Sequence, residues 1–221
     1  MFETVHCKSF EEMNSKAAQV IVKEITNSKK QFSLALPGGN SVKGILEKLA
    51  KQNIWNAVNV FMVDERMVPI DSEESNFKQA NDLFFSKVKG IHTNSFEVEK
   101  GIDDYNKKFD AIKKFDLVVL GVGEDGHVAS LFPNHESIKS KEIGFIKVKN
   151  APKEPKARIS LSPKSISDAK LIIFLFASES KKNAYKKFAD EKTDYTECPA
   201  KISMNAENVL VFTVFGDEYA E

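Results

Sequence analysis

The residues best suited to chemistry stand together in mid-chain, in the sequence Gly-Glu-Asp-Gly-His at positions 123–127. An imidazole titrates near neutral pH, so His127 is a candidate general base, and Asp125, two residues earlier, can orient its ring. Four apolar residues at 117–120 precede this turn and are typical of a strand buried on both faces. Because ligands bind beyond the carboxyl ends of strands in open α/β sheets, we expect the active site here.

The glycines of this turn also fit two other interpretations. Gly121, Gly123 and Gly126 match the GxGxxG spacing of dinucleotide-binding turns. The motif lies in mid-chain, however, and carboxylates at 124 and 125 would repel a pyrophosphate, so we reject a dinucleotide site. The second alternative is a histidine that only packs or caps the turn. Its removal would lower thermal stability and leave turnover per folded molecule near normal.

Other strand ends carry groups that suit a phosphate. An expected strand at 32–36 runs into Pro-Gly-Gly-Asn-Ser at 37–41, where backbone N–H groups ahead of a helix favour an anion. A strand at 58–63 ends at Asp64-Glu65-Arg66, and Arg158 lies on a later one. Guanidinium groups bind phosphate dianions through paired hydrogen bonds. The sequence therefore predicts a phosphate site at the same edge as the histidine.

The elements that must position these groups alternate between strand and helix, which predicts an α/β fold with a largely parallel sheet. We expect a single domain over residues 1–221, since no internal repeat, low-complexity block or linker interrupts it. Apolar runs predict strands over 2–7, 32–36, 58–63, 95–98, 117–120, 145–149, 157–161, 171–176 and 208–214. Helical spacing predicts six helices. One begins after Ser9, one follows the turn at 37–41 and ends at about 52, and a short one begins at 162. The other three lie over 75–86, 103–114 and 178–190.

Composition narrows the class of protein. The 221 residues carry 32 Lys and Arg against 32 Asp and Glu, so no global field attracts nucleic acid or an anionic membrane. Neither a signal peptide nor a membrane span is evident, and we expect a cytoplasmic protein. No ligand-like spacing joins the cysteines or histidines, so no metal site is expected. These residues are Cys7, Cys198, His6, His92, His127 and His135.

Three segments carry a family resemblance. They are VDERMVP at 63–69 followed by Ser75-Asn76, FDLVVLGVGEDGHVASLFP at 115–133, and PKARISL at 155–161. Weaker matches are Lys181 and Cys198-Pro199-Ala200. Together they resemble the signatures of the glucosamine-6-phosphate isomerase/6-phosphogluconolactonase family over nearly the whole chain. One segment departs from the family pattern: its phosphate loop usually reads SGGST-P, and here PGGNSV occupies 37–42.

The resemblance implies a three-layer α/β/α sandwich like that of the sugar-phosphate isomerases and coenzyme A transferases. It also implies hydrolysis of 6-phosphoglucono-δ-lactone, the second step of the oxidative pentose phosphate pathway. Arg66 favours the lactonase branch, because the deaminating branch usually has tyrosine after Asp-Glu. The alternatives are a glucosamine-6-phosphate deaminase and a non-catalytic sugar-phosphate-binding protein, and the presence of His127 and Asp125 argues against the latter.

On this hypothesis the site residues have separate roles. His127 activates water as the general base, and Asp125 orients the imidazole or the substrate hydroxyls. The expected partner is a small-molecule phosphosugar lactone, with no nucleic acid and no membrane, and the sequence leaves association with a partner dehydrogenase open. The protein is expected to be a monomer, and the chemistry needs no cofactor. The residues expected to bind substrate or phosphate are Gly38, Gly39, Asn40, Ser41, Lys43, Asp64, Arg66, Arg158 and Lys181.

Overall fold

The computed structural model describes residues 2–216, and within them ten strands form two sheets. The strands are β1 (Glu3–His6), β2 (Phe32–Leu36), β3 (Val58–Met62), β4 (Asp64–Arg66), β5 (His92–Asn94), β6 (Leu117–Gly121), β7 (Phe145–Val148), β8 (Arg158–Leu161), β9 (Leu171–Phe176) and β10 (Val209–Thr213). The α-helices are α1 (Phe10–Asn27), α2 (Lys43–Leu49), α3 (Asn76–Leu83), α4 (Gly101–Asp110), α5 (Pro163–Ser167) and α6 (Lys182–Ala189). Short 3₁₀ helices cover Phe85–Lys87, Glu136–Lys139, Glu179–Lys181 and Pro199–Asn205.

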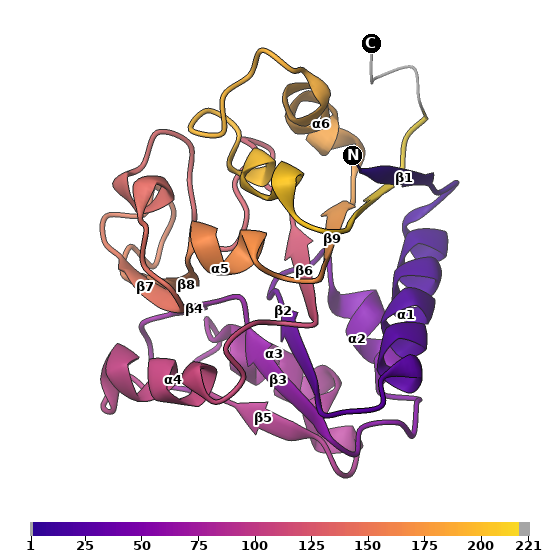
Figure 1. Ribbon diagram of the computed structural model, residues 1–221, viewed down its shortest axis with the longest axis vertical. Helices are drawn as coiled ribbons and strands as arrows, with labels where there is room; N and C mark the ends of the chain where they lie inside the picture. The colour runs from indigo at the N-terminus through magenta and orange to yellow at the C-terminus, as the bar shows by residue number, and fades with distance from the viewer. Residues whose placement is uncertain (1, 217–221) are drawn as a thin grey trace.

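The larger sheet has the order β1-β10-β9-β6-β2-β3-β5, and all its strand pairs are parallel. Successive side chains of a strand enter opposite cores: Leu34 and Leu36 pack toward α1, α2 and α3, whereas Ala35 faces the other side. That second core is covered by α4, α5, α6 and the small sheet, and Figure 1 shows α1 and α2 across the sheet from α4 and α5. The expected three-layer α/β/α sandwich is therefore confirmed.

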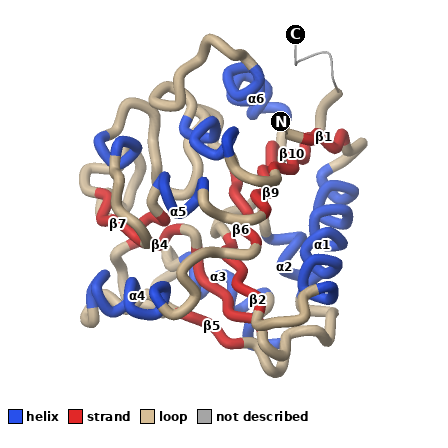
Figure 2. The backbone as a smooth tube through the Cα atoms, viewed as in Figure 1, coloured by secondary structure: helices blue, strands red, loops and turns tan. Residues whose placement is uncertain are grey.

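The smaller sheet was not predicted. Asp64–Arg66, expected as charged residues at the end of a strand, form β4, which pairs antiparallel with β8, and β8 pairs antiparallel with β7. The backbone of Val63 makes the transition, because its N–H donates to Leu36 O at 2.9 Å and its carbonyl accepts from Leu161 N at 2.7 Å. In Figure 2, β4 and β7 lie to one side of the strands of the large sheet and form a separate group.

One predicted strand and the end of one predicted helix are wrong for identifiable reasons. The strand expected over 95–98 lies earlier, as β5 at His92–Asn94, and it ends where the Tyr105 hydroxyl donates to Asn94 O at 3.3 Å and Phe96 turns into the core. The helix expected over 103–114 ends as α4 at Asp110, ahead of Lys113, whose φ of 63° is incompatible with a continuing helix.

Serine caps fix the starts of three helices. Ser9 accepts a backbone hydrogen bond from Glu12 N, and α3 and α5 begin in the same way after Ser75 and Ser162. None of the helices in the described part of the chain is long and apolar enough to cross a membrane.

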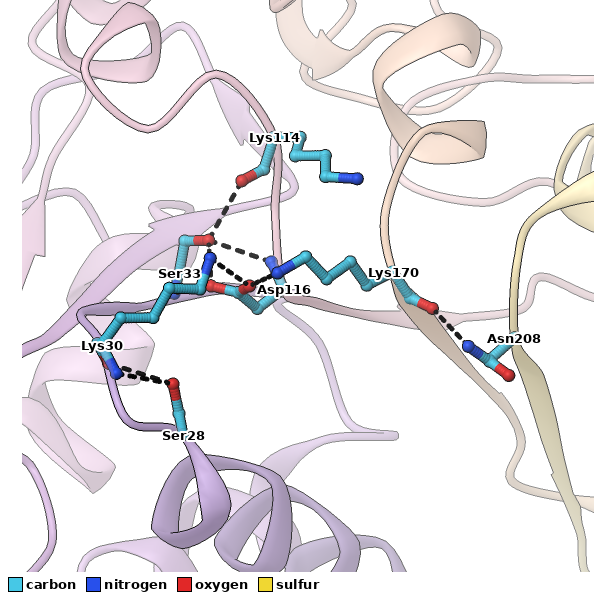
Figure 3. A network of polar contacts seen from close by, with 7 residues as sticks. All are labelled: Ser28, Lys30, Ser33, Lys114, Asp116, Lys170 and Asn208. Atoms are coloured by element: carbon cyan, nitrogen blue, oxygen red, sulfur yellow. Dashed lines mark hydrogen bonds and ion pairs between the residues drawn. The ribbon is translucent and has the colours of Figure 1, made fainter.

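A carboxylate ties three strands together at the amino-terminal edge of the large sheet (Figure 3). Asp116, which directly precedes β6, accepts hydrogen bonds from Ser33 N and Ser33 Oγ of β2, both at 2.9 Å. It also accepts one at 2.5 Å from Nζ of Lys170, the residue before β9. Lys30 Nζ lies 3.4 Å from the same carboxylate. Burial raises the pKa of Asp116, but these donors outweigh it, so the pKa lies below its ordinary value.

Replacing this carboxylate should weaken the fold. We expect Asp116→Asn to lower the free energy of unfolding by about 1–3 kcal/mol. The substitution replaces one carboxylate oxygen with an amide nitrogen, which cannot accept the hydrogen bonds that the oxygen accepted. Urea unfolding measures the loss at neutral pH. Since the folded pKa is lowered, the wild-type advantage is present above the unfolded pKa and disappears as the pH falls through the folded one.

A matched control is Asp168→Asn, which removes an exposed i,i+4 partner of Lys164. Surface pairs of this kind contribute little, so its effect should stay within about 0.5 kcal/mol. Equal losses in the two variants would contradict the role given to Asp116.

Candidate active site

The loops after β2, β3, β6 and β9 meet at the carboxyl edge of the large sheet and enclose a cleft of about 190 Å³. A larger open groove, of about 1050 Å³, lies between α1 and the β1–β10–β9 end of the sheet. We place the site in the smaller cleft because the polar groups suited to chemistry converge there. Its lining residues are Pro37, Gly38, Gly39, Ser41, Asp64, Arg66, Asn76, Gly121, Val122, Gly123, His127, Ala129, Arg158 and Lys181.

His127 and Asp125 form a hydrogen-bonded pair at this cleft. Asp125 Oδ1 lies 2.5 Å from His127 Nδ1 and also accepts from the His127 N–H at 3.2 Å. An ionised carboxylate only accepts, so Nδ1 carries the proton and Nε2 keeps a free lone pair. Burial raises the pKa of Asp125, but hydrogen bonding to His127 outweighs it, and the pKa lies well below the usual range. His127 lines the cleft and Asp125 lies outside the lining.

The shape of this turn depends on its glycines. Gly123 N donates to His127 O at 2.8 Å, and a Cβ on Gly123 would lie 2.0 Å from His127 Nδ1. Gly126 has a φ of +87°, which favours glycine, and a Cβ there would meet Cys198 Sγ at 2.9 Å. The glycines therefore allow the imidazole to fold back over the turn, against Gly123. Since the Gly123 N–H is already used, it is not available to a substrate oxyanion.

The glycine loop after β2 forms another wall. Gly38, Gly39 and Ser41 line the cleft, whereas Asn40 and Lys43 are exposed outside it. The Gly39 N–H, expected to meet a phosphate, donates instead to Gln79 Oε1 at 2.8 Å. Gln79 was missed, and no motif in the sequence distinguishes it from other polar residues on α3.

Asn76 joins this loop to β4. A Cβ on Gly38 would lie 2.0 Å from Asn76 Oδ1, so only glycine allows this approach. Asn76 Nδ2 donates to Asp64 O at 3.0 Å and lies 3.3 Å from Asp64 Oδ1. The other oxygen of Asp64 accepts from Ser130 Oγ at 2.6 Å. Asp64, predicted to touch substrate, thus lines the cleft while bonded on both sides. Asn76 was available to sequence reasoning through the Ser-Asn pair of the first signature.

Glu65 caps the helix that carries Asn76. Its carboxylate is 3% exposed and accepts from the backbone N–H groups of Arg66, Asn76 and Phe77 at 2.7–2.8 Å, and from Ser75 Oγ at 3.2 Å. A carboxylate at a helix amino terminus is favoured by the free N–H groups there. Burial raises the pKa of Glu65, opposed by these backbone donors. Its role is structural.

Three cations line the cleft. Arg66 donates through Nη1 to Glu74 O, and its Nε is buried without a hydrogen-bond partner within the described chain. An unpaired buried guanidinium N–H is costly and suits an incoming anion. Lys181 follows β9, and burial lowers the pKa of its ammonium. Arg158 is buried and donates through Nε and Nη2 to the carbonyls of Lys153, Glu154 and Pro155, so only part of its guanidinium faces the cleft.

The model of the glucosamine-6-phosphate isomerase/6-phosphogluconolactonase family matches residues 8–212. The chain belongs to this family. Among its relatives, a 6-phosphogluconolactonase from Borreliella burgdorferi is 36% identical over 83% of this chain and 84% of its own. A 6-phosphogluconolactonase from Thermotoga maritima is 33% identical over 73% and 76% of the two chains. The family resemblance expected from the sequence is thus confirmed.

Solved structures of the family agree with the fold. A 6-phosphogluconolactonase from Trypanosoma cruzi superposes with a TM-score of 0.86 over 96% of this chain and 94% of that one, at 23% identity. The Thermotoga maritima 6-phosphogluconolactonase gives 0.78 over 96% and 98%, at 27% identity. A monomeric glucosamine-6-phosphate deaminase gives 0.80 at 20% identity, over 96% and 97%. The fold is therefore shared by both branches and does not choose between them.

Among residues 2–216, no group of three or more His, Cys, Asp or Glu side chains is arranged to hold a metal ion. The cleft offers instead one paired imidazole, two arginines, one lysine and the hydroxyl of Ser41. Such a set can accept a proton from water and can hold an anion. It suits hydrolysis of a phosphorylated ester.

The contact between Gly38 and Asn76 can be tested directly. We expect Gly38→Ala to lower the free energy of unfolding by about 1–3 kcal/mol, because the new methyl group displaces a buried, hydrogen-bonded amide. Gly216→Ala is the control, since a Cβ there meets nothing within 4 Å. In a double-mutant cycle, Asn76→Ala should recover part of the loss. Strict additivity of the two changes in urea unfolding would rule out the contact as the cause.

Proposed function

We propose that this protein hydrolyses 6-phospho-D-glucono-1,5-lactone to 6-phospho-D-gluconate. One observation carries the proposal: the Asp125–His127 pair opens onto the same small cleft as Arg66, Lys181 and Arg158. A lactone that bears a phosphate needs both a base and a cationic anchor, and the cleft supplies both. The relatives from Borreliella burgdorferi and Thermotoga maritima, at 36% and 33% identity, are named 6-phosphogluconolactonases, which supports the same assignment.

The chemistry follows from the pair. His127 Nε2 takes a proton from water as the water oxygen attacks C1 of the lactone, forming a tetrahedral oxyanion. The C1–ring oxygen bond then breaks, and the imidazolium returns its proton to the departing ring oxygen, which becomes the 5-hydroxyl. Asp125 holds the ring in the required tautomer and stabilises the imidazolium. A lining cation that does not hold the phosphate can stabilise the developing negative charge.

The phosphate is bound, on this proposal, chiefly by Arg66 and Lys181. The unpartnered Nε of Arg66 gives a free donor, and Ser41 with the Gly38–Gly39 backbone forms the adjacent wall. Asp64 contributes a carboxylate for sugar hydroxyls. Asn40 and Lys43 stay secondary candidates because they lie outside the lining. We further propose that the protein is a cytoplasmic monomer. We also propose that it has no nucleic-acid partner, in keeping with the balanced charge of the chain.

Removing the base should stop catalysis and spare binding. His127→Ala should lower turnover by about 10²–10⁴-fold relative to wild type, after subtraction of the spontaneous hydrolysis rate, since that is the usual contribution of a general base. Binding of 6-phosphogluconate, measured by calorimetry, should change little because the phosphate ligands remain.

The control for this change is His135→Ala. His135 bonds to Ser137 and Lys149 O, away from the cleft lining, and its loss should leave turnover near normal. Near-normal turnover in folded His127→Ala protein, with a lowered melting temperature, would instead assign His127 a purely structural role.

Removing the anchor should discriminate between substrates. Arg66→Ala should raise the KM for 6-phosphogluconolactone by about ten- to hundredfold, the effect of losing a charge-assisted hydrogen bond of about 1.5–3 kcal/mol. Hydrolysis of unphosphorylated gluconolactone should be nearly unaffected. Lys43→Ala provides the comparison with a nearby cation outside the lining. If both lactones suffer equally from Arg66→Ala, Arg66 is not a phosphate ligand.

A further inference from the structure

The loop between β7 and β8 brings a lysine to the far side of the catalytic pair. Lys153 Nζ lies 3.9 Å from Asp125 Oδ2, while Asp125 Oδ1 bonds to His127. The two oxygens of one carboxylate therefore face an ammonium and an imidazole. Neither Lys153 nor its loop lines the cleft, and none of the roles assigned above includes them.

This loop is held by a buried cation. Arg158 donates to Lys153 O at 3.1 Å, to Glu154 O at 2.9 Å and to Pro155 O at 2.8 Å, so three successive carbonyls converge on one guanidinium. Ala151 N donates to Lys156 O at 3.0 Å and closes the base of the loop. Planar, always charged arginine is suited to such a multiple contact. The contacts of Arg158 with these three carbonyls, here called the Arg158 clamp, fix the backbone from which the Lys153 side chain extends.

The same guanidinium reaches the catalytic histidine by a second route. Arg158 Cζ lies 5.7 Å from the centre of the Phe132 ring, and that ring lies 4.9 Å from the imidazole of His127. Arg158 thus supports His127 through an aromatic contact and supports Asp125 through the Lys153 loop. A change in the loop would be felt at the pair that performs proton transfer.

We infer that Lys153 is a positioning residue for the reaction, held by the Arg158 clamp and acting on His127 through Asp125. The ammonium offsets part of the negative charge of Asp125 and fixes the rotation of its carboxylate. Without Lys153, the negative charge of Asp125 acts more strongly on the His127 ring, and this stabilises the protonated imidazolium. The inference rests on the proposed function for its kinetic consequence, while its electrostatic consequence is independent of it.

Other charges also face Asp125. Lys181, in the 3₁₀ helix before α6, interacts electrostatically with Glu124, Lys153 and Asp125. Cys198 packs under Gly126, and burial raises its pKa to about 11, so its thiol stays neutral near physiological pH. These groups are unchanged in the variants below, so a difference between variants reports the substituted lysine.

The chain provides a matched pair for the test. Lys153 and Lys156 lie on the same loop with side chains 54% and 66% exposed, and Lys156 Nζ lies 3.7 Å from Glu154 rather than near Asp125. Each is changed to Met, which removes the charge, and to Glu, which reverses it. Both sites are exposed, so folding should be preserved, and thermal unfolding verifies this for each variant.

The primary readout is the titration midpoint of the His127 ring, followed by NMR and assigned with His127→Ala. Lys153→Met should move the midpoint to higher pH by a few tenths of a unit, and Lys153→Glu by about one unit, the scale of a charge change on the far side of the Asp125 carboxylate in a solvated setting. The shifts should shrink as salt is raised. The Lys156 variants should coincide with wild type.

The kinetic readout depends on the proposed lactonase activity. The acid limb of kcat/KM should move in parallel with the NMR midpoint. In Lys153→Glu, kcat near neutral pH should fall about three- to tenfold while KM changes less than twofold. Coincident His127 midpoints in Lys153→Glu and Lys156→Glu would overturn the inference, as would a rise in KM confined to the phosphorylated lactone. Absence of lactonase activity in the wild type would refute the proposed function and leave the NMR result to decide on Lys153.

Discussion

Two adjacent carboxylates, Asp64 and Glu65, are buried where the two sheets meet, and the rest of the site depends on how they are satisfied. Burying an ionised carboxylate is expensive unless it is fully hydrogen-bonded. Glu65 meets this requirement with three backbone N–H groups and a serine hydroxyl, which fixes α3 against β4. Asp64 meets it with Asn76 and Ser130, which fixes α3 against the loop after β6. These buried hydrogen bonds of Asp64 and Glu65, here called the brace, determine where the walls of the cleft lie.

The brace leaves the functional groups few degrees of freedom. Asn76 presses against Gly38, so the glycine loop is held at one distance from β4, and Gln79 takes the Gly39 N–H. On the facing wall the glycines of the β6 turn allow His127 to fold back over the turn toward Asp125. The buried polar network thus turns flexible glycine segments into a preformed cleft, which lowers the entropic cost of binding.

Much of this arrangement is readable from the sequence, and the remainder has a physical reason for being hidden. Apolar runs predicted a parallel sheet because strands buried on both faces need them, and signature motifs marked the loops at their carboxyl ends. The second sheet escaped prediction because Asp64–Arg66 is too short and too charged to indicate a strand before β8 is known to lie beside it. The Gln79 and Lys153 contacts escaped because they join segments distant in sequence through single polar side chains.

On the proposed function, one cleft holds both ends of a phosphosugar lactone. A crystal structure with the product 6-phosphogluconate tests it most directly. We expect the C1 carboxylate to lie within hydrogen-bonding reach of His127 Nε2 and the phosphate to lie against Arg66, Lys181 and the glycine loop. A phosphate placed against His127, or a product bound only in the open groove beside α1, would contradict it.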